Sequence, residues 1–250
     1  MLSSSNIQVM SNAILKASKN LRRDFGELEK LQNSRTSIKA FVDNSFNNTK
    51  ELIYTELNSA RPDWWLLFKK NDNDKLEKKD KKFCVIKPIS GISNFAKGIG
   101  YFALSAVYFN NNVAEAVVIY DPIKDELYFS EKGRGAFVNN SRIRFSSTQN
   151  LSDSLFVFNN KELILKSIQI NILKKINSEI RIFGCSCLDI ANLASGKIDC
   201  YVSQNELESI LEPGLLLIQE AGGISYQKQS EKNITFYSNN YINDLLKNTL

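Results

Sequence analysis

The sequence predicts a layered α/β fold in which helices and sheets stack in two lobes. Three observations support this prediction: apolar residues at helical spacing near the N-terminus, β-rich runs in the middle, and alternating strand and helix patterns after residue 150. The chain has 250 residues and is 43% hydrophobic, enough for a sizeable core. We expect one compact unit with an N-terminal lobe over 1–150 and a C-terminal lobe over 151–250.

The N-terminal lobe is predicted to begin with two helices and to continue as a sheet. Apolar residues recur at helical intervals over 6–24, and a second helix over 44–59 ends before a proline. Strands are predicted over 65–68, 83–86, 101–109, 113–121 and 126–130. Asn110 and Asn111 mark a hairpin turn between two of these strands.

The C-terminal lobe alternates strands with helices. Strands are predicted over 155–158, 181–183, 199–202 and 234–237. Helices are predicted over 160–177, 188–195 and 209–221 and at the C-terminus. Gly222 and Gly223 end the third of these helices.

Composition and charge exclude several classes of protein. The chain has no histidine, so Ser-His-Asp catalysis, Cys-His catalysis and His-ligated metal sites are excluded. The formal charge is +5, and a run of seven lysines and four acids at 69–82 carries much of it. A mixed-sign run of this kind predicts a solvated loop, so we expect no direct nucleic-acid binding.

The cysteines and the absence of long apolar runs indicate a reducing compartment. None of the four cysteines forms a CxxC pair, so a zinc or thioredoxin-type site is not expected. No run of eighteen apolar residues is present, so we expect no membrane span. The first twenty residues lack acids, as a transit peptide would, but they also carry a helical pattern. We expect a cytoplasmic protein.

Six short runs occur in an order and spacing that resemble one family. They are RDFGE at 23–27, KPISGISNF at 87–95, EKGRGAF at 131–137, LDIA at 188–191, GKID at 196–199 and EAGG at 220–223. Over roughly residues 6–240 the chain resembles the inositol monophosphatase family, and within it the bacterial SuhB branch. The resemblance implies an αβαβα sandwich, usually a homodimer, that hydrolyses phosphate monoesters with Mg²⁺.

The family's metal-binding motifs are acidic, and this sequence departs from them at the carboxylates. The resemblance implies a Glu-Glu pair, then Asp-Pro-Ile-Asp-Gly-Thr, then Trp-Asp, because Mg²⁺ needs anionic oxygen ligands. These motifs align with Lys69-Lys70, with Lys87-Pro88-Ile89-Ser90-Gly91-Ile92 and with Ser209-Ile210. An early acidic position aligns with Phe46, and a substrate-contacting carboxylate of several relatives aligns with Ser203.

These departures predict a degenerate metal site. The degenerate positions are Lys69, Lys87, Ile89, Ser90, Ile92 and Ile210. We therefore expect no catalytic residue, no metal ligand and no metal cofactor in this chain. A shifted register at the charged loop, which would place Glu77 at the Glu-Glu pair, remains an alternative.

Other polar residues have simpler interpretations. Asp121 and Asp189 are typical of a turn and of a helix start. Cys185 and Cys187 precede a helix that would stabilise a thiolate, but without a histidine base they are expected to be small packing residues.

Three functions compete. The first is a non-catalytic interaction protein that contacts RNA polymerase or a Nus factor in transcription antitermination, as the SuhB resemblance implies. The second is a module that binds a phosphorylated small molecule through Lys69, Lys87, Gly91 and Ser93. The third is an active Mg²⁺-dependent inositol-1-phosphate phosphatase with rearranged ligands.

Overall fold

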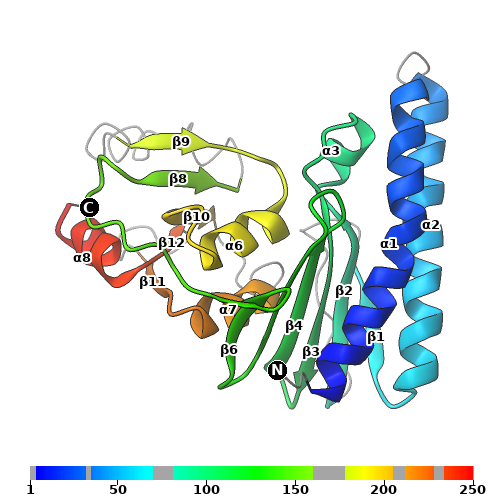
Figure 1. The fold of residues 1–250 in the computed structure, drawn as a ribbon, viewed down its shortest axis with the longest axis horizontal. Helices are drawn as coiled ribbons and strands as arrows, with labels where there is room; N and C mark the ends of the chain where they lie inside the picture. The colour runs from blue at the N-terminus through cyan, green and yellow to red at the C-terminus, as the bar shows by residue number, and fades with distance from the viewer. Residues whose placement is uncertain are drawn as a thin grey trace.

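The computed structural model describes residues 4–31, 35–69, 81–159, 178–204, 212–227 and 234–249. Five layers alternate between helices and sheets (Figure 1). Helices α1 (Ser5–Leu31) and α2 (Arg35–Ala60) cover one face of a seven-stranded sheet. Helices α6 (Ser186–Ala194) and α7 (Glu212–Glu220) separate this sheet from a five-stranded sheet, whose outer face is covered by α8 (Asn240–Thr249). This arrangement confirms the predicted layered fold.

The seven-stranded sheet runs in chain order, with one parallel pair at its edge. Its strands are β1 (Trp65–Phe68), β2 (Lys82–Ser90), β3 (Ala103–Asn110), β4 (Val113–Asp121), β5 (Glu126–Glu131), β6 (Gly135–Val138) and β7 (Ser141–Ile143). Only β1 and β2 are parallel; every other neighbouring pair is antiparallel. A short helix, α3 (Ile92–Ala96), follows β2 directly. Because β1 and β2 are parallel, their C-terminal ends lie at the same end of the sheet.

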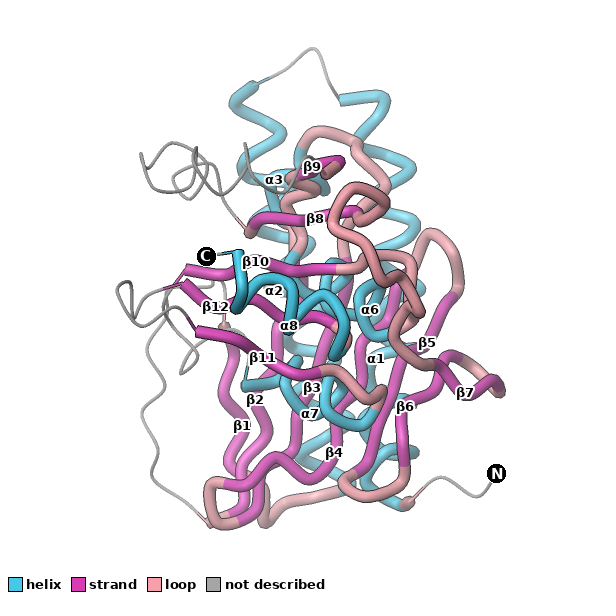
Figure 2. The backbone as a smooth tube through the Cα atoms, turned by 90° about the vertical axis from the view of Figure 1, so that its left-hand side faces the viewer, coloured by secondary structure: helices cyan, strands magenta, loops and turns pink. Residues whose placement is uncertain are grey.

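The five-stranded sheet has the order β11-β12-β10-β8-β9. Its strands are β8 (Leu155–Phe158), β9 (Glu179–Arg181), β10 (Cys200–Gln204), β11 (Ile224–Gln227) and β12 (Ile234–Ser238). Figure 2 shows these strands running across the direction of the strands in the larger sheet. Buried side chains between the two sheets and around α6 and α7 form a shared hydrophobic core.

The hairpin between β3 and β4 turns one residue later than predicted. Asn111 and Asn112 both have positive φ, 48° and 65°. Asparagine tolerates this left-handed region better than most residues, which explains why two of them form the turn.

Several predicted elements differ from the structure in their bounds. The first helix continues past residue 24 because buried Leu28 extends its apolar face, and the second begins at Arg35 instead of 44. The strand predicted over 181–183 lies at Glu179–Arg181, where Leu155 of β8 pairs with Glu179. The short strands β6, β7 and β11 were not predicted, and the helix predicted over 160–177 lies outside the described residues.

Candidate functional site

Two lysines lie side by side where β1 and β2 run in parallel. Phe68 pairs with Ile86 in the parallel register, and the next residue, Lys69, donates its backbone N–H to the carbonyl of Ile86 at 2.8 Å. Lys69 and Lys87 are therefore neighbours on adjacent strands. Both are buried, with exposed fractions of 3% and 4%.

Strand alternation places both lysines on the face of the sheet that is turned toward α6. Trp65 and Leu67 of β1 pack against the core between the sheets, and so do Phe83 and Val85 of β2. Side chains two residues apart share a face, so Lys69 and Lys87 continue these two rows. The structure thus brings two ammonium groups into one buried neighbourhood.

The end of β2 is held against the start of α6 by small side chains. Ser90 is buried, and its carbonyl and hydroxyl oxygens lie 3.4 and 3.5 Å from the sulfur of Cys185. Gly91 has φ of +79°, and a Cβ there would lie 2.9 Å from the Cβ of Cys185. A glycine is required at this position both for its backbone conformation and for the close approach of α6.

Two other positions of the expected degenerate site, Ile89 and Ile92, do not lie beside the lysines. Ile89 is buried and Ile92 half-buried, and both pack into the core beneath α1 and α2. Ser93 is exposed on α3. Lys70 and Ile210 lie outside the described residues. Of the expected anion-binding set, Lys69 and Lys87 form a buried pair, whereas Ser93 is exposed.

Ser105 and Cys187 complete the neighbourhood of Lys87, and sequence patterns did not single out Ser105. Ser105 pairs with Lys87 across β2 and β3, and the Cys187 sulfur lies 3.4 Å from its hydroxyl oxygen. Burial raises the pKa of the Cys185 thiol well above its usual value, and the neighbouring Cys187 adds to the shift. The Cys185 thiol is therefore neutral and buried. This state fits the packing role predicted for Cys185 and does not fit a catalytic thiolate.

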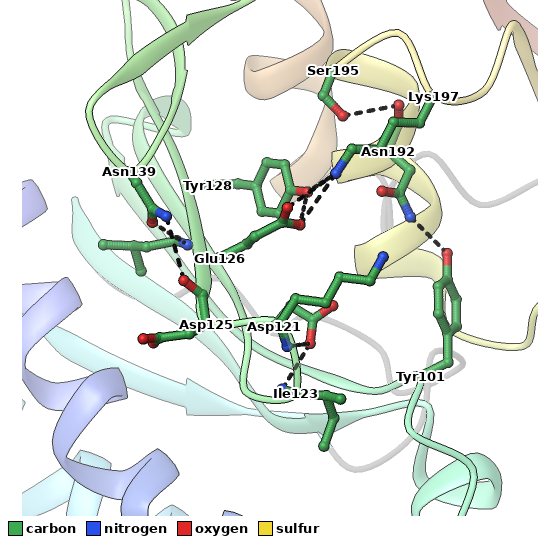
Figure 3. Close-up of polar contacts among 12 residues, drawn as sticks. Tyr101, Asp121, Ile123, Asp125, Glu126, Tyr128, Asn139, Asn192, Ser195 and Lys197 are labelled. Atoms are coloured by element: carbon green, nitrogen blue, oxygen red, sulfur yellow. Dashed lines mark hydrogen bonds and ion pairs between the residues drawn. The ribbon is translucent and has the colours of Figure 1, made fainter.

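Two carboxylates near this end of the sheet have structural partners. One oxygen of Asp121 accepts the backbone N–H groups of Ile123 and Lys124, at 2.9 and 3.1 Å, which is the turn predicted for it. The hydroxyl of Tyr101 donates to Asp189 at 2.8 Å, and Asp189 lies in the first turn of α6, the helix start predicted for it. The same hydroxyl accepts a hydrogen bond from the side chain of Asn192 at 3.0 Å (Figure 3).

A second polar network joins β5 to the turn after α6. The Lys197 ammonium lies 3.2 Å from a carboxylate oxygen of Glu126 and 2.9 Å from the hydroxyl of Tyr128 (Figure 3). Although burial acts to raise the pKa of Glu126, hydrogen bonds from Tyr128 and Lys197 hold it below its ordinary value. This network links the GKID run to the larger sheet.

The turn between β5 and β6 keeps the motif that carried the resemblance. The carboxylate of Glu220, at the end of α7, accepts the backbone N–H groups of Gly133 and Gly135 at 2.6 and 2.7 Å. Both glycines have positive φ. The EKGRGAF and EAGG runs therefore meet in space and tie α7 to the sheet.

The residues around the lysine pair do not fit a divalent cation. Mg²⁺ is bound by anionic and neutral oxygen atoms. Lys69 and Lys87 offer ammonium groups, and Ser90 offers a hydroxyl. Within the described part of the chain, no three His, Cys, Asp or Glu side chains are grouped so that they could hold a metal ion.

Comparisons with known proteins agree with the fold and with the motifs. Residues 3–245 match the model of the inositol monophosphatase family. The chain is 32% identical to "Inositol-1-monophosphatase" of Mesorhizobium japonicum, covering 89% of this chain and 85% of that protein. It is 27% identical to "Nus factor SuhB" of Pasteurella multocida, covering 87% and 83%.

A solved structure extends this likeness to the whole chain. The extragenic suppressor protein SuhB from Bartonella henselae superposes with a TM-score of 0.80 at 27% identity, covering 100% of this chain and 99% of that one. None of the described helices is long and apolar enough to cross a membrane. The chain belongs to the inositol monophosphatase family, among relatives that include the SuhB proteins.

Proposed function

We propose that this chain is a non-catalytic member of its family, which does not hydrolyse phosphate monoesters with Mg²⁺ and acts by binding other molecules. The observation that carries the proposal is the buried pair Lys69 and Lys87, at positions that align with metal-binding acids of the family. Ser90, at the end of β2, adds no negative charge to this site.

A lysine in place of a metal-binding acid has an electrostatic effect large enough to prevent Mg²⁺ binding. A divalent ion about 4 Å from a unit charge interacts by roughly 8 kcal/mol at an effective dielectric constant of ~20. Replacing an acid by a lysine turns that attraction into a repulsion of similar size. Two such replacements side by side would expel Mg²⁺ even if solvent weakened each interaction several-fold.

Isothermal titration calorimetry with Mg²⁺ tests this proposal without an activity assay. We expect no heat of binding at millimolar Mg²⁺, and no rise in melting temperature. Saturable binding that is unaffected by Lys87→Ala would show that other residues supply the ligands, and the proposal would be wrong.

The proposed partner is a protein of the transcription machinery, either RNA polymerase or a Nus factor. Support comes from several relatives that carry the name "Nus factor SuhB", including one from Buchnera aphidicola that is 32% identical over 210 residues. Affinity capture from the native host lysate should recover one of these components. Captures that repeatedly lack both would contradict this choice of partner.

We also propose a homodimer, for which one end of the larger sheet offers a surface. Ile99 and Ile123 are 51% and 44% exposed, and Gly100, the chain neighbour of Ile99, has a Cβ position that lies 3.5 Å from Ile123. Exposed isoleucines on one part of the surface support an interface there. The double substitution Ile99→Asp and Ile123→Asp should therefore shift the chain to a monomer in analytical ultracentrifugation, whereas the exposed-site control Val113→Asp should not.

A second candidate function is binding of a phosphate or sugar phosphate without hydrolysis. The favouring observation is the same lysine pair, which supplies positive charge where the family uses metals. If this candidate is correct, inositol-1-phosphate should raise the melting temperature, and Lys87→Glu should abolish the rise. An unchanged rise in the variant would exclude the lysine pair as the binding site.

A further inference from the structure

A cavity of about 390 Å³ lies between the β3–β4 hairpin and α7. Phe109, Val113 and Ala114 line it from the hairpin, and Leu215 and Leu216 line it from α7. Lys132, in the turn after β5, contributes a charged group to the same wall. The volume of the cavity falls within the range of small-molecule binding sites.

The cavity is far from the lysine pair. Lys87 pairs with Ser105 of β3, whereas Phe109, which lines the cavity, lies four residues further along the same strand. The separation is roughly 14 Å, at about 3.4 Å per residue. Figure 1 shows α3 at the upper end of this sheet and α7 lower down, near β4 and β6. A ligand in the cavity therefore would not touch the site of the proposed function.

The floor of the cavity is apolar and firmly packed. Phe109 is buried and stacks on Phe83, with ring centroids 4.7 Å apart and planes 5° from parallel. Leu216 is also buried, while Val113 is 43% exposed. An apolar body entering here would be covered by side chains already held in place by the core.

Two charged side chains, Lys132 and Glu220, line the cavity, and the contacts of the nearby acids leave Lys132 to receive an anionic group of the ligand. Both carboxylate oxygens of Glu220 accept backbone N–H groups of the β5–β6 turn, and Glu131 forms an ion pair with Arg134 at 3.2 Å. Among the described residues, no carboxylate lies within ion-pair distance of the Lys132 ammonium. Lys132 thus provides the positive charge next to the apolar floor.

We propose that this cavity binds a small carboxylic acid with an aromatic or branched aliphatic body. The carboxylate pairs with Lys132, and the body packs between Phe109 and Leu215. The inference goes beyond the proposed function and is independent of whether the chain retains phosphatase activity.

Methyl NMR on the full chain tests the proposal with 3-phenylpropionate and its neutral analogue 3-phenylpropanamide, each titrated to about 10 mM. We expect the acid to shift the methyl signals of Val113, Ala114, Leu215 and Leu216, and to bind at least fivefold more tightly than the amide. Lys132→Met should weaken binding of the acid about tenfold and leave the amide unchanged. Lys124→Met, which removes an exposed lysine at the far end of β4, is the matched control.

A second variant tests the shape of the cavity. Ala114→Leu places extra side-chain volume inside it and should abolish binding of both probes. The proposal is overturned if neither probe shifts these methyl signals, if acid and amide bind equally, or if Lys132→Met leaves the affinity for the acid unchanged.

Discussion

The β5–β6 turn and the lysine end of the same sheet retain the family pattern to very different degrees. At the turn, Gly133, Gly135 and Glu220 keep the motif residues, and each takes part in a hydrogen bond that ties α7 to the sheet. At the other end, Lys69, Lys87 and Ser90 occupy the positions that we propose to correspond to acidic residues of the family motifs. On this proposal, residues that hold the fold together are retained, whereas residues that would serve only a metal have changed.

The largest expected effect is at Glu220. Glu220→Gln removes a charged acceptor of two backbone N–H groups, and hydrogen bonds to charged groups contribute about 1.5–3 kcal/mol each. We expect the free energy of unfolding in urea to fall by about 2–3 kcal/mol. Gln219→Ala, at an exposed position on the same helix, should change it by less than about 0.5 kcal/mol. Equal effects would remove the structural role assigned to the turn.

A pair of glycine substitutions sharpens this prediction within the turn. Gly135 has φ of +85°, and a Cβ there would lie 2.9 Å from a guanidinium nitrogen of Arg142. Gly133 has φ of +77° with nothing within 4 Å of its Cβ position. Arg142 is exposed and its guanidinium can move aside, so Gly135→Ala and Gly133→Ala should each cost about 1 kcal/mol in the same unfolding experiment, because both place an alanine at positive φ. No loss of stability at either position would contradict the turn conformation.

The Glu126–Lys197 contact predicts a pH dependence of stability. The pKa of Glu126 is lower in the folded chain than its ordinary value of 4.5, so the unfolded chain binds the proton more readily. The contribution of Glu126 to stability is thus present above pH 4.5 and is lost as the pH falls below it. Glu126→Gln should flatten the pH profile of urea unfolding in this acid range, and an unchanged profile would exclude the contact.

The smallest effect is expected at the lysine end. Among the described residues, the Ser90 hydroxyl has a single long contact, with the Cys185 sulfur at 3.5 Å. Ser90→Ala should therefore lower the free energy of unfolding by about 0.5 kcal/mol or less. A loss as large as that of Glu220→Gln would show that Ser90 is retained for the fold, and the comparison between the two ends would fail.

Sequence patterns predicted the layers of the fold better than the details of the site. The apolar spacing near the N-terminus and the β-rich runs in the middle of the chain were enough to place α1 and the meander of strands, because α1 buries one face and β4 buries both. The strands β6 and β7 were missed because each is four residues or fewer and one begins at a glycine. Their place is fixed by successive antiparallel pairing, of β6 with β5 and of β7 with β6, through short turns that give little apolar pattern.

At the site, too, sequence patterns predict neighbours along one strand but not contacts between distant segments. The sequence predicted a strand over 83–86 that runs into KPISGI, whereas the structure continues β2 through Lys87 to Ser90. The contact between Ser105 and Cys187 depends on how α6 approaches the sheet across 82 residues of chain. No local pattern could have predicted it.

The most direct test of the central claim is phosphate release from inositol-1-phosphate by the purified, folded chain, with and without millimolar Mg²⁺. We predict no release above the buffer in either condition, with a catalytically active relative as the positive control. Mg²⁺-dependent turnover that survives Lys87→Ala would contradict the account, because other carboxylates would then hold the metal.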